Sequence, residues 1–236
     1  MSFDHRVTAR GAVPQVGIDQ GLRSYMLRVY NYMAGGLAIT GAVAYAAAAS
    51  GIYVQLAQTP LFWLVVLAPL GLVLLLSFRI QQMSLGAAQA TFWGYAALVG
   101  LSLGGIFLVY TGASIAQTFF VTAATFMAMS LWGYTTKKDL TGMGHFLFMG
   151  LIGIIIASLV NFFFRSPALY FAVSIIGVVV FTGLTAWDTQ RIKEMYWEGD
   201  DSVVAGKKSI MGALALYLDF LNLFLMLMQL MGQRRD

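Results

Sequence analysis

The sequence predicts an all-α integral membrane protein with seven transmembrane helices, on three observations. Of its 236 residues, 59% are hydrophobic and 10% are charged, whereas a soluble domain usually carries about 25% charged residues. Seven apolar runs are each close to the roughly 20 residues that a helix needs to cross a bilayer. The Lys and Arg residues lie mostly between these runs. A soluble fold is therefore excluded.

The seven predicted spans are joined by short connections, except for a longer one after the sixth. They cover residues 29–52, 61–78, 88–110, 115–134, 144–164, 168–196 and 210–231. Residues 1–28 form a polar cytosolic arm that lacks the apolar segment and cleavage site of a secretory signal peptide. Residues 233–236 form a short tail. One membrane domain, residues 29–232, thus makes up most of the chain.

The distribution of basic residues predicts the orientation, because cytoplasmic loops are rich in Lys and Arg. With the N-terminus in the cytoplasm, eleven of the fourteen Lys and Arg residues lie on the inner side, and three, Arg165, Arg234 and Arg235, lie outside. Seven crossings then place the C-terminus outside, whereas a re-entrant last helix would return the tail to the cytoplasm. Because the basic residues are dispersed among apolar runs, we do not expect a nucleic-acid partner.

One carboxylate, Asp219, lies within the last apolar run, "GALALYLDFLNLFLMLMQLMG". It follows the start of that span by nine residues, which is about 14 Å along a helix and close to the bilayer centre. A charge there costs at least about 2.5–3.5 kcal/mol, so the side chain must face the protein interior and be paired or protonated. Small or polar residues at helical spacing mark the same face, with Met226 among them: Gly212, Ala215, Asp219, Asn222, Met226 and Gln229.

The predicted partner of Asp219 is Asp188, on one condition. If the sixth helix continues to residue 196, Asp188 lies about 12 Å deep and level with Asp219. The segment "DTQRIKEMYW" contains neither Gly nor Pro, which favours continuation. Two carboxyl groups in contact share a proton readily and act as a pH sensor, and when both are ionised they supply oxygen ligands for Ca²⁺. The alternative is that a protonated Asp219 only joins two helices.

Three further residues complete the predicted site. Arg79 ends the second span, and its guanidinium could bind ionised Asp188 as a latch between the second and sixth helices. The alternative for Arg79 is an interfacial arginine whose charged end reaches the aqueous side. Asn222 and Thr185 are predicted to add to the polar face around the acid pair. We expect no catalytic residue and no resident cofactor.

The quoted segments resemble the Bax inhibitor family, also called the transmembrane Bax inhibitor motif family. The resemblance rests on "VYNYMAGGLAITGAVAY" in the first helix and above all on "WDTQRI" and "ALYLDFLNLF", which each bring an aspartate to the last two helices. It implies six helices surrounding the C-terminal one and a pH-sensitive Ca²⁺ leak in a bacterial inner membrane. The resemblance also implies that Asp188 and Asp219 are the family's aspartate pair. Arg79 matches the family's latch by location alone.

Three functions remain open from the sequence. The first is a calcium leak channel gated by protonation of the acid pair. The second is a non-conducting regulator that binds a membrane protease or another membrane protein, a role to which some bacterial family members are linked. The third is a proton-coupled transporter. A retinal protein is not expected, because the predicted last helix has no lysine to form a Schiff base. An intramembrane hydrolase is not expected either, because neither histidine lies deep within a span, so we do not expect an enzyme.

Overall fold

The computed structural model describes residues 20–235, which are helical almost throughout. Its elements are α1 (Gln20–Ala49), α2 (Ile52–Ala57), α3 (Leu61–Arg79), the 3₁₀ helix η1 (Ile80–Gln82), α4 (Leu85–Leu103), α5 (Gly105–Val109), α6 (Gly112–Thr135), α7 (Thr141–Phe164), α8 (Pro167–Glu194) and α9 (Ser202–Met231). In this part of the chain, seven segments are long and apolar enough to cross a membrane. The predicted fold class is confirmed.

Several helices extend beyond the predicted spans. Helix α1 begins at Gln20 rather than at residue 29, so residues 20–28 of the predicted arm are helical, and residues 1–19 lie outside the described part. Helix α9 begins at Ser202 rather than at residue 210, where the Asp201 carboxylate caps the Val204 amide at 2.7 Å. The reason is that these first turns are polar and project past the hydrocarbon region, where hydropathy no longer marks a helix.

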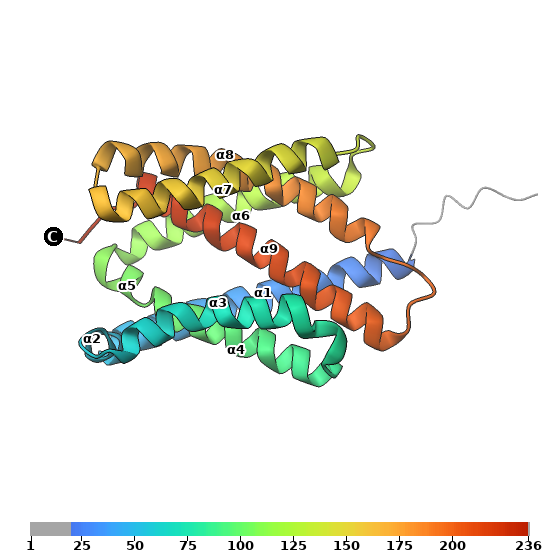
Figure 1. The fold of residues 1–236 in the computed structure, drawn as a ribbon, viewed down its shortest axis with the longest axis horizontal. Coiled ribbons are helices and arrows are strands. Elements are labelled where there is room, and N and C mark those ends of the chain that lie inside the picture. Colours follow the sequence, from blue (N-terminus) through green and yellow to red (C-terminus); the bar gives the residue numbers. More distant parts are fainter. Residues whose placement is uncertain (1–19, 236) are drawn as a thin grey trace, which may run out of the picture.

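The helices form two groups joined by α9 (Figure 1). One group consists of α1, α3 and α4, and the other of α6, α7 and α8. Helix α9 runs obliquely between them and is the most buried of the seven spans. It packs mainly against α8, α1, α6 and α4, while α3 packs on α4 and α7 packs on α8. The prediction that all six other spans surround the last one is therefore not confirmed.

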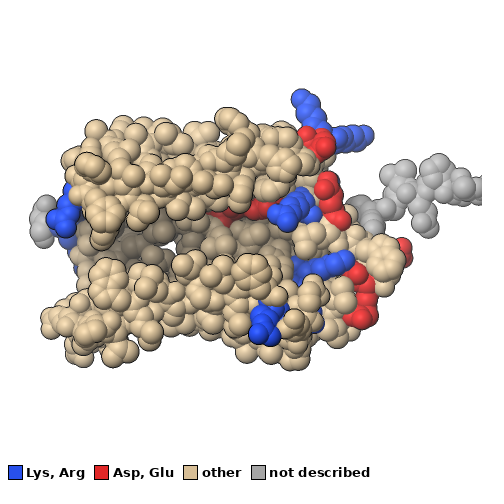
Figure 2. All heavy atoms as spheres, viewed as in Figure 1, with Lys and Arg blue, Asp and Glu red and all other residues tan. Residues whose placement is uncertain are grey.

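The two ends of the bundle differ in charge. Figure 2 shows acidic and basic side chains gathered at the end where α1 begins, whereas the charged side chains visible among the described residues at the opposite end are basic. At that opposite end the C-terminal tail pairs with the α5–α6 connection: the Thr111 amide donates to the Gln233 carbonyl and the Arg235 amide to the Val109 carbonyl. Helix α9 thus runs the full length of the bundle, about 45 Å for its 30 residues, and is not re-entrant. Which end faces the cytoplasm stays a prediction.

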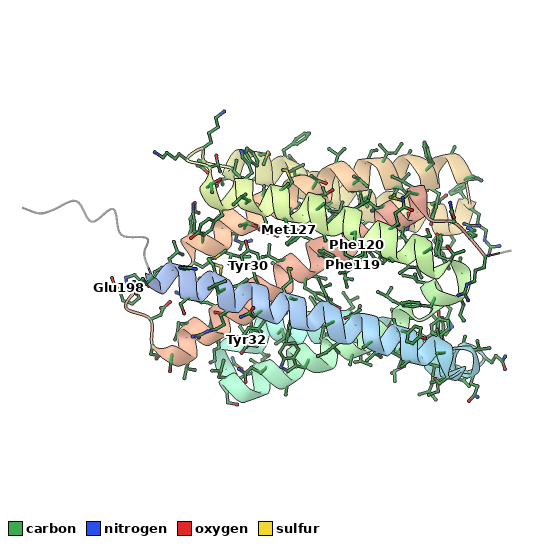
Figure 3. The ribbon with its side chains drawn as sticks, turned by 180° about the vertical axis from the view of Figure 1, so that it is seen from behind. Tyr30, Tyr32, Phe119, Phe120, Met127 and Glu198 are labelled. Carbon is green, nitrogen blue, oxygen red and sulfur yellow. The ribbon has the colours of Figure 1, made fainter. Side chains whose placement is uncertain are left out.

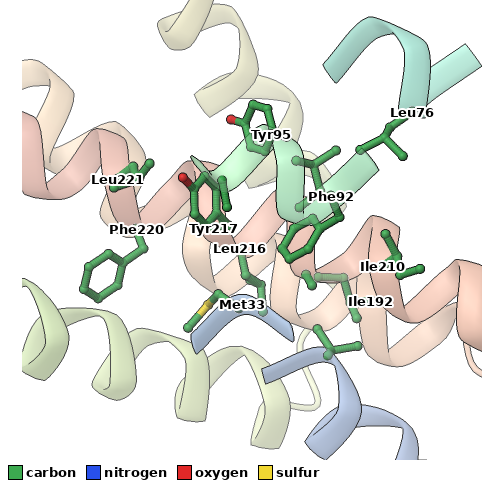
Figure 4. Packing of buried hydrophobic residues seen from close by; sticks show 14 of the residues in the cluster. Met33, Leu76, Phe92, Tyr95, Ile192, Ile210, Leu216, Tyr217, Phe220 and Leu221 are labelled. Atoms are coloured by element: carbon green, nitrogen blue, oxygen red, sulfur yellow. The ribbon is translucent and has the colours of Figure 1, made fainter. Parts of the chain in front are cut away.

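Tyr217 of α9 is fully buried where α9 meets α1 and α4 (Figure 4). Its ring makes edge-to-face contacts with Phe92 and Tyr95 of α4. Its hydroxyl lies 2.6 Å from the Thr40 hydroxyl, which donates to the Ala96 carbonyl at 2.9 Å. Because hydrocarbon offers no hydrogen bonds, these polar groups hold the three helices in one register.

Glycines allow the closest helix contacts. A Cβ atom on Gly100 of α4 would come within 2.6 Å of the Thr40 carbonyl oxygen in α1. A Cβ atom on Gly133 of α6 would overlap the Ala186 backbone in α8. Small residues at such crossings let helix backbones approach in lipid. Gly100 therefore serves close packing of α1 against α4 within the bundle.

We expect the Gly133→Ala variant to be destabilised by about 1–3 kcal/mol, because α6 and α8 must separate to admit the methyl group. The measurement is thermal unfolding in detergent. Gly153→Ala is the matched control, since a Cβ atom there meets nothing within 4 Å and alanine favours the helix. An unchanged unfolding temperature for Gly133→Ala would contradict the close α6–α8 contact.

Candidate functional site

The length of α8 decides whether the two predicted acids can meet. The helix continues without a break to Glu194, six residues past Asp188. Asp188 therefore lies in the helix that packs along α9, and not in the following loop. The run "DTQRIKE", which begins at Asp188, contains neither Gly nor Pro and gives no stop signal. The helix ends two residues before the predicted residue 196 and still includes Asp188 well before its end, so the two acids can meet.

Asp188 and Asp219 form a hydrogen-bonded pair of carboxyl groups. Asp219 is 5% exposed, and its Oδ2 atom has no hydrogen-bond partner within the described residues. Asp188 is partly buried. Two carboxylates in contact are not both ionised at low cost.

The pair lies in a cavity of about 770 Å³ between the two helix groups. Its walls come from α3, α4, α7, α8 and α9, and most of the lining is apolar. The exceptions are Ser158, Asp188, Arg191, Asp219, Asn222 and Tyr95. Figure 2 shows the hollow between the upper and lower helices, with acidic atoms inside it. Because α3 and α7 are not packed together, the cavity opens sideways between them.

A proline shapes one wall of this cavity. Pro69, inside α3, lines it and has no N–H for the carbonyl of Val65 one turn earlier. The hydroxyl of Ser102 in α4 donates to that carbonyl at 2.9 Å. A broken helix bond in a membrane is tolerated where a neighbouring side chain replaces it. The α3–α4 contact thus stabilises an irregular wall facing the acids.

The basic group beside the pair is Arg191, and not the predicted Arg79. Arg191 lines the cavity, acts on Asp188 through its charge and lies over the Trp187 ring at 5.5 Å. The Arg79 guanidinium instead donates to Gln82 at 2.8 Å at the exposed end of α3. Arg79 therefore does not make the predicted latch in this structure. Sequence reasoning missed Arg191, although its position three residues after Asp188 places the two on one helix face.

The two supporting residues have different positions. Asn222 lines the cavity one turn after Asp219, and its amide donates to the Leu218 carbonyl at 2.8 Å. Thr185 is fully buried, and its hydroxyl donates to the Phe181 carbonyl at 2.8 Å in its own helix. Thr185 is absent from the cavity lining. The structure therefore brings Asn222 to the acid pair but not Thr185.

Arg191 also lines a second, smaller hollow. This hollow is about 350 Å³, lies toward the end where α1 begins, and contains His145, Gln190 and Glu194. Trp187 and Arg191 line both hollows, so they stand between the acid pair and the polar end of the bundle. Gln190 fixes this region, because its amide accepts from the Leu140 amide and donates to the Lys138 carbonyl, both at 2.8 Å.

The donor set suits a transient rather than a firmly held metal ion. Among residues 20–235, no three His, Asp or Glu side chains converge to hold a metal. The pair and Asn222 offer hard oxygen ligands, but Ca²⁺ takes six to eight. Water or carbonyl groups would have to supply the rest.

Comparison with known proteins agrees with the geometry of the last two helices. The family described as "Inhibitor of apoptosis-promoting Bax1" matches residues 22–236. The chain belongs to the Bax inhibitor family. It is 53% identical over 219 residues to the inner membrane protein YbhL of Escherichia coli K12, covering 91% of this chain and 94% of YbhL. It is also 53% identical to RP147 of Rickettsia prowazekii, over 92% and 93% of the two chains.

More distant relatives extend the family among bacteria. The membrane protein SpyM3_0260 of Streptococcus pyogenes is 34% identical, over 91% of this chain and 95% of the relative. With the seven apolar helices, these relatives identify the chain as a multi-pass membrane protein. The resemblance found from the two aspartate segments is therefore confirmed at the level of the family.

We expect a short thiol-to-thiol cross-linker to join α8 and α9 in the Asp188→Cys, Asp219→Cys double variant, because the two side chains are in contact. The chain has no cysteine of its own, so the cross-linker can react only with the introduced thiols. A protease site inserted in the α8–α9 connection provides the measurement: after cleavage, cross-linked halves migrate together on a denaturing gel.

The control for this cross-link combines Val179→Cys with Asp219→Cys. Val179 is 64% exposed and lies on the outer surface of α8. After cleavage, the two halves of this control variant should separate on the gel. The halves of each single-cysteine variant should separate as well. Equal cross-linking of the Val179 pair, or none of the Asp188 pair, would contradict the assigned contact.

Proposed function

We propose that this Bax inhibitor family protein is a pH-sensitive cation leak of the bacterial inner membrane, with Ca²⁺ as a permeant ion. The observation that carries the proposal is the hydrogen-bonded pair of Asp188 and Asp219 in a cavity within the membrane-spanning part. Carboxylates at such depth are costly and mark ion or proton pathways by default. The inner-membrane location follows the relative in Escherichia coli, and a cytoplasmic N-terminus follows the basic residues.

In this proposal the protonation state of the pair controls the path. With one shared proton, the pair carries one negative charge, which holds the Arg191 guanidinium beside Asp188. A second proton removes that charge and releases Arg191 from the cavity. The remaining lining from α3 and α7 is uncharged, and Tyr95 of α4 is neutral near pH 7. Acidification therefore opens the path, and alkalinisation closes it.

Arg191 takes the role that the sequence suggested for Arg79. It stands between the acid cavity and the polar hollow toward the start of α1. A guanidinium there repels cations and pairs with a carboxylate, so it closes the route while Asp188 is charged. The Arg79 latch stays a prediction, because it requires the end of α3 to move toward α8.

We expect Ca²⁺ uptake into dye-loaded liposomes to rise as the pH falls from about 8 to about 6. One titrating proton limits the rise to about tenfold per pH unit. In the Asp188→Asn, Asp219→Asn double variant this pH dependence should vanish, because amides do not titrate. Liposomes without protein are the control for passive leakage.

Absence of flux from well-folded wild type would overturn the leak. The non-conducting regulator of a membrane protease or other membrane protein would then be the better function, with the acids as a structural pair. Uptake that requires an opposing proton gradient would indicate an exchanger instead.

We expect Arg191→Gln to raise Ca²⁺ uptake at pH 8 to near its value at pH 6, because the closed state loses its positive charge. Arg191→Lys should keep part of the closure, since the charge remains. Arg79→Gln is the matched comparison and should leave the pH profile unchanged. The opposite pattern, with Arg79→Gln constitutively open and Arg191→Gln normal, would restore Arg79 as the latch.

A further inference from the structure

A groove of about 950 Å³ lies between α1 and α6, on the opposite side of α9 from the acid pair. Helices α1 and α6 each pack on α9 and approach one another less closely, bridged by the hydroxyls of Tyr30 and Ser130, so the groove opens sideways toward the surrounding lipid. Figure 3 looks onto this face, where Tyr30 of α1 and Phe119 of α6 lie along the groove. Phe220 of α9 lines it between the two helices.

The lining of the groove is apolar over nearly its whole length. On α1 it extends from Arg23 to Gly41, which is about 27 Å of helix and close to the roughly 30 Å of bilayer hydrocarbon. On α6, Met127 and Leu131 are each 64% exposed at its edge. The hydroxyls of Tyr30 and Ser130 bond to one another at 2.6 Å, so they do not need water. In a bilayer, such a space is filled by an acyl chain.

A positive charge marks one end of the groove. Arg23 lines that end and also lines an adjoining polar hollow of about 720 Å³ that contains Arg28, Ser24 and Asn31. Of the residues that the structure describes, none that lines either space is acidic. Within residues 20–235, Arg23 has no carboxylate at ion-pairing distance. A guanidinium at the membrane interface binds phosphate through paired N–H groups.

The other end of the groove carries no such charge. It continues along α1 and α6 into an apolar hollow of about 320 Å³ lined by Leu37, Ala44, Phe120 and Phe224. Acyl chain and phosphate can therefore be accommodated together in one direction only, with the phosphate toward the start of α1.

We propose that the groove between α1 and α6 binds one anionic phospholipid, with its phosphate at Arg23 and an acyl chain between the two helices. The leaflet is the one that faces the start of α1. The site is independent of the proposed cation leak, since it lies across α9 from the acid pair. A second copy of the chain is the competing occupant.

Native mass spectrometry of the purified full chain tests the site. The protein is given equal amounts of phosphatidylglycerol and phosphatidylcholine with identical acyl chains. We expect wild type to retain one phosphatidylglycerol with about fivefold preference, the effect of one basic residue at an anionic headgroup. Arg23→Gln should lose that preference and still bind lipid.

The second variant, Gly41→Leu, fills the groove. A Cβ atom on Gly41 meets nothing within 4 Å, so the leucine enters the open space without a backbone clash and should reduce binding of both lipids. Lys137→Gln, an exposed charge in a loop, and Gly71→Leu, an equally open glycine in α3, are the matched controls.

The lipid site is supported if both controls keep the wild-type selectivity, Arg23→Gln loses the preference for phosphatidylglycerol and Gly41→Leu binds less of both lipids. Equal retention of the two lipids by wild type would overturn it, as would unchanged binding in Gly41→Leu. A dimer mass in wild type that disappears in Gly41→Leu would assign the groove to a second copy and also overturn the proposal.

Discussion

Every polar group within the membrane-spanning part must find its partner in the protein, because hydrocarbon supplies none. The bundle meets this constraint with hydrogen bonds between helices. Ser102 of α4 satisfies the carbonyl that Pro69 leaves free in α3. Tyr217 of α9 bonds to Thr40 of α1. These contacts fix the helices in depth and rotation, and therefore decide which side chains line each hollow.

Asp219 stands out against this background. Its Oδ2 atom is among the few buried side-chain atoms without a partner in the described part of the chain. An unsatisfied carboxylate oxygen near the bilayer centre is costly, and a purely structural acid would be expected to be fully bonded. The contact with Asp188 accounts for one side of the carboxyl group. Asp219 also lines the cavity between α3 and α7, which favours a functional pair over a link between two helices.

Helix α9 separates two hollows of similar size and different chemistry. Asp219 lines the one between α3 and α7, and the next residue, Phe220, lines the one between α1 and α6. Successive residues in a helix point about 100° apart, so one helix presents an acid to one side and an aromatic ring to the other. The acid side suits protons and cations. The aromatic side suits acyl chains, with one arginine at its end.

The sequence by itself determined the seven spans, the aspartate in the last helix and the family, because hydropathy and short segments such as "WDTQRI" are local properties. It also predicted that Asp188 can meet Asp219 if the sixth helix runs long, which α8 does. The position of Arg79 away from the acid pair, the exclusion of Thr185 and the groove between α1 and α6 were decided by the tertiary structure alone. These depend on how each helix is rotated about its axis and which neighbours it packs against, and no single segment encodes that. In lipid, where apolar residues cover both inner and outer faces, hydropathy does not distinguish one face from another.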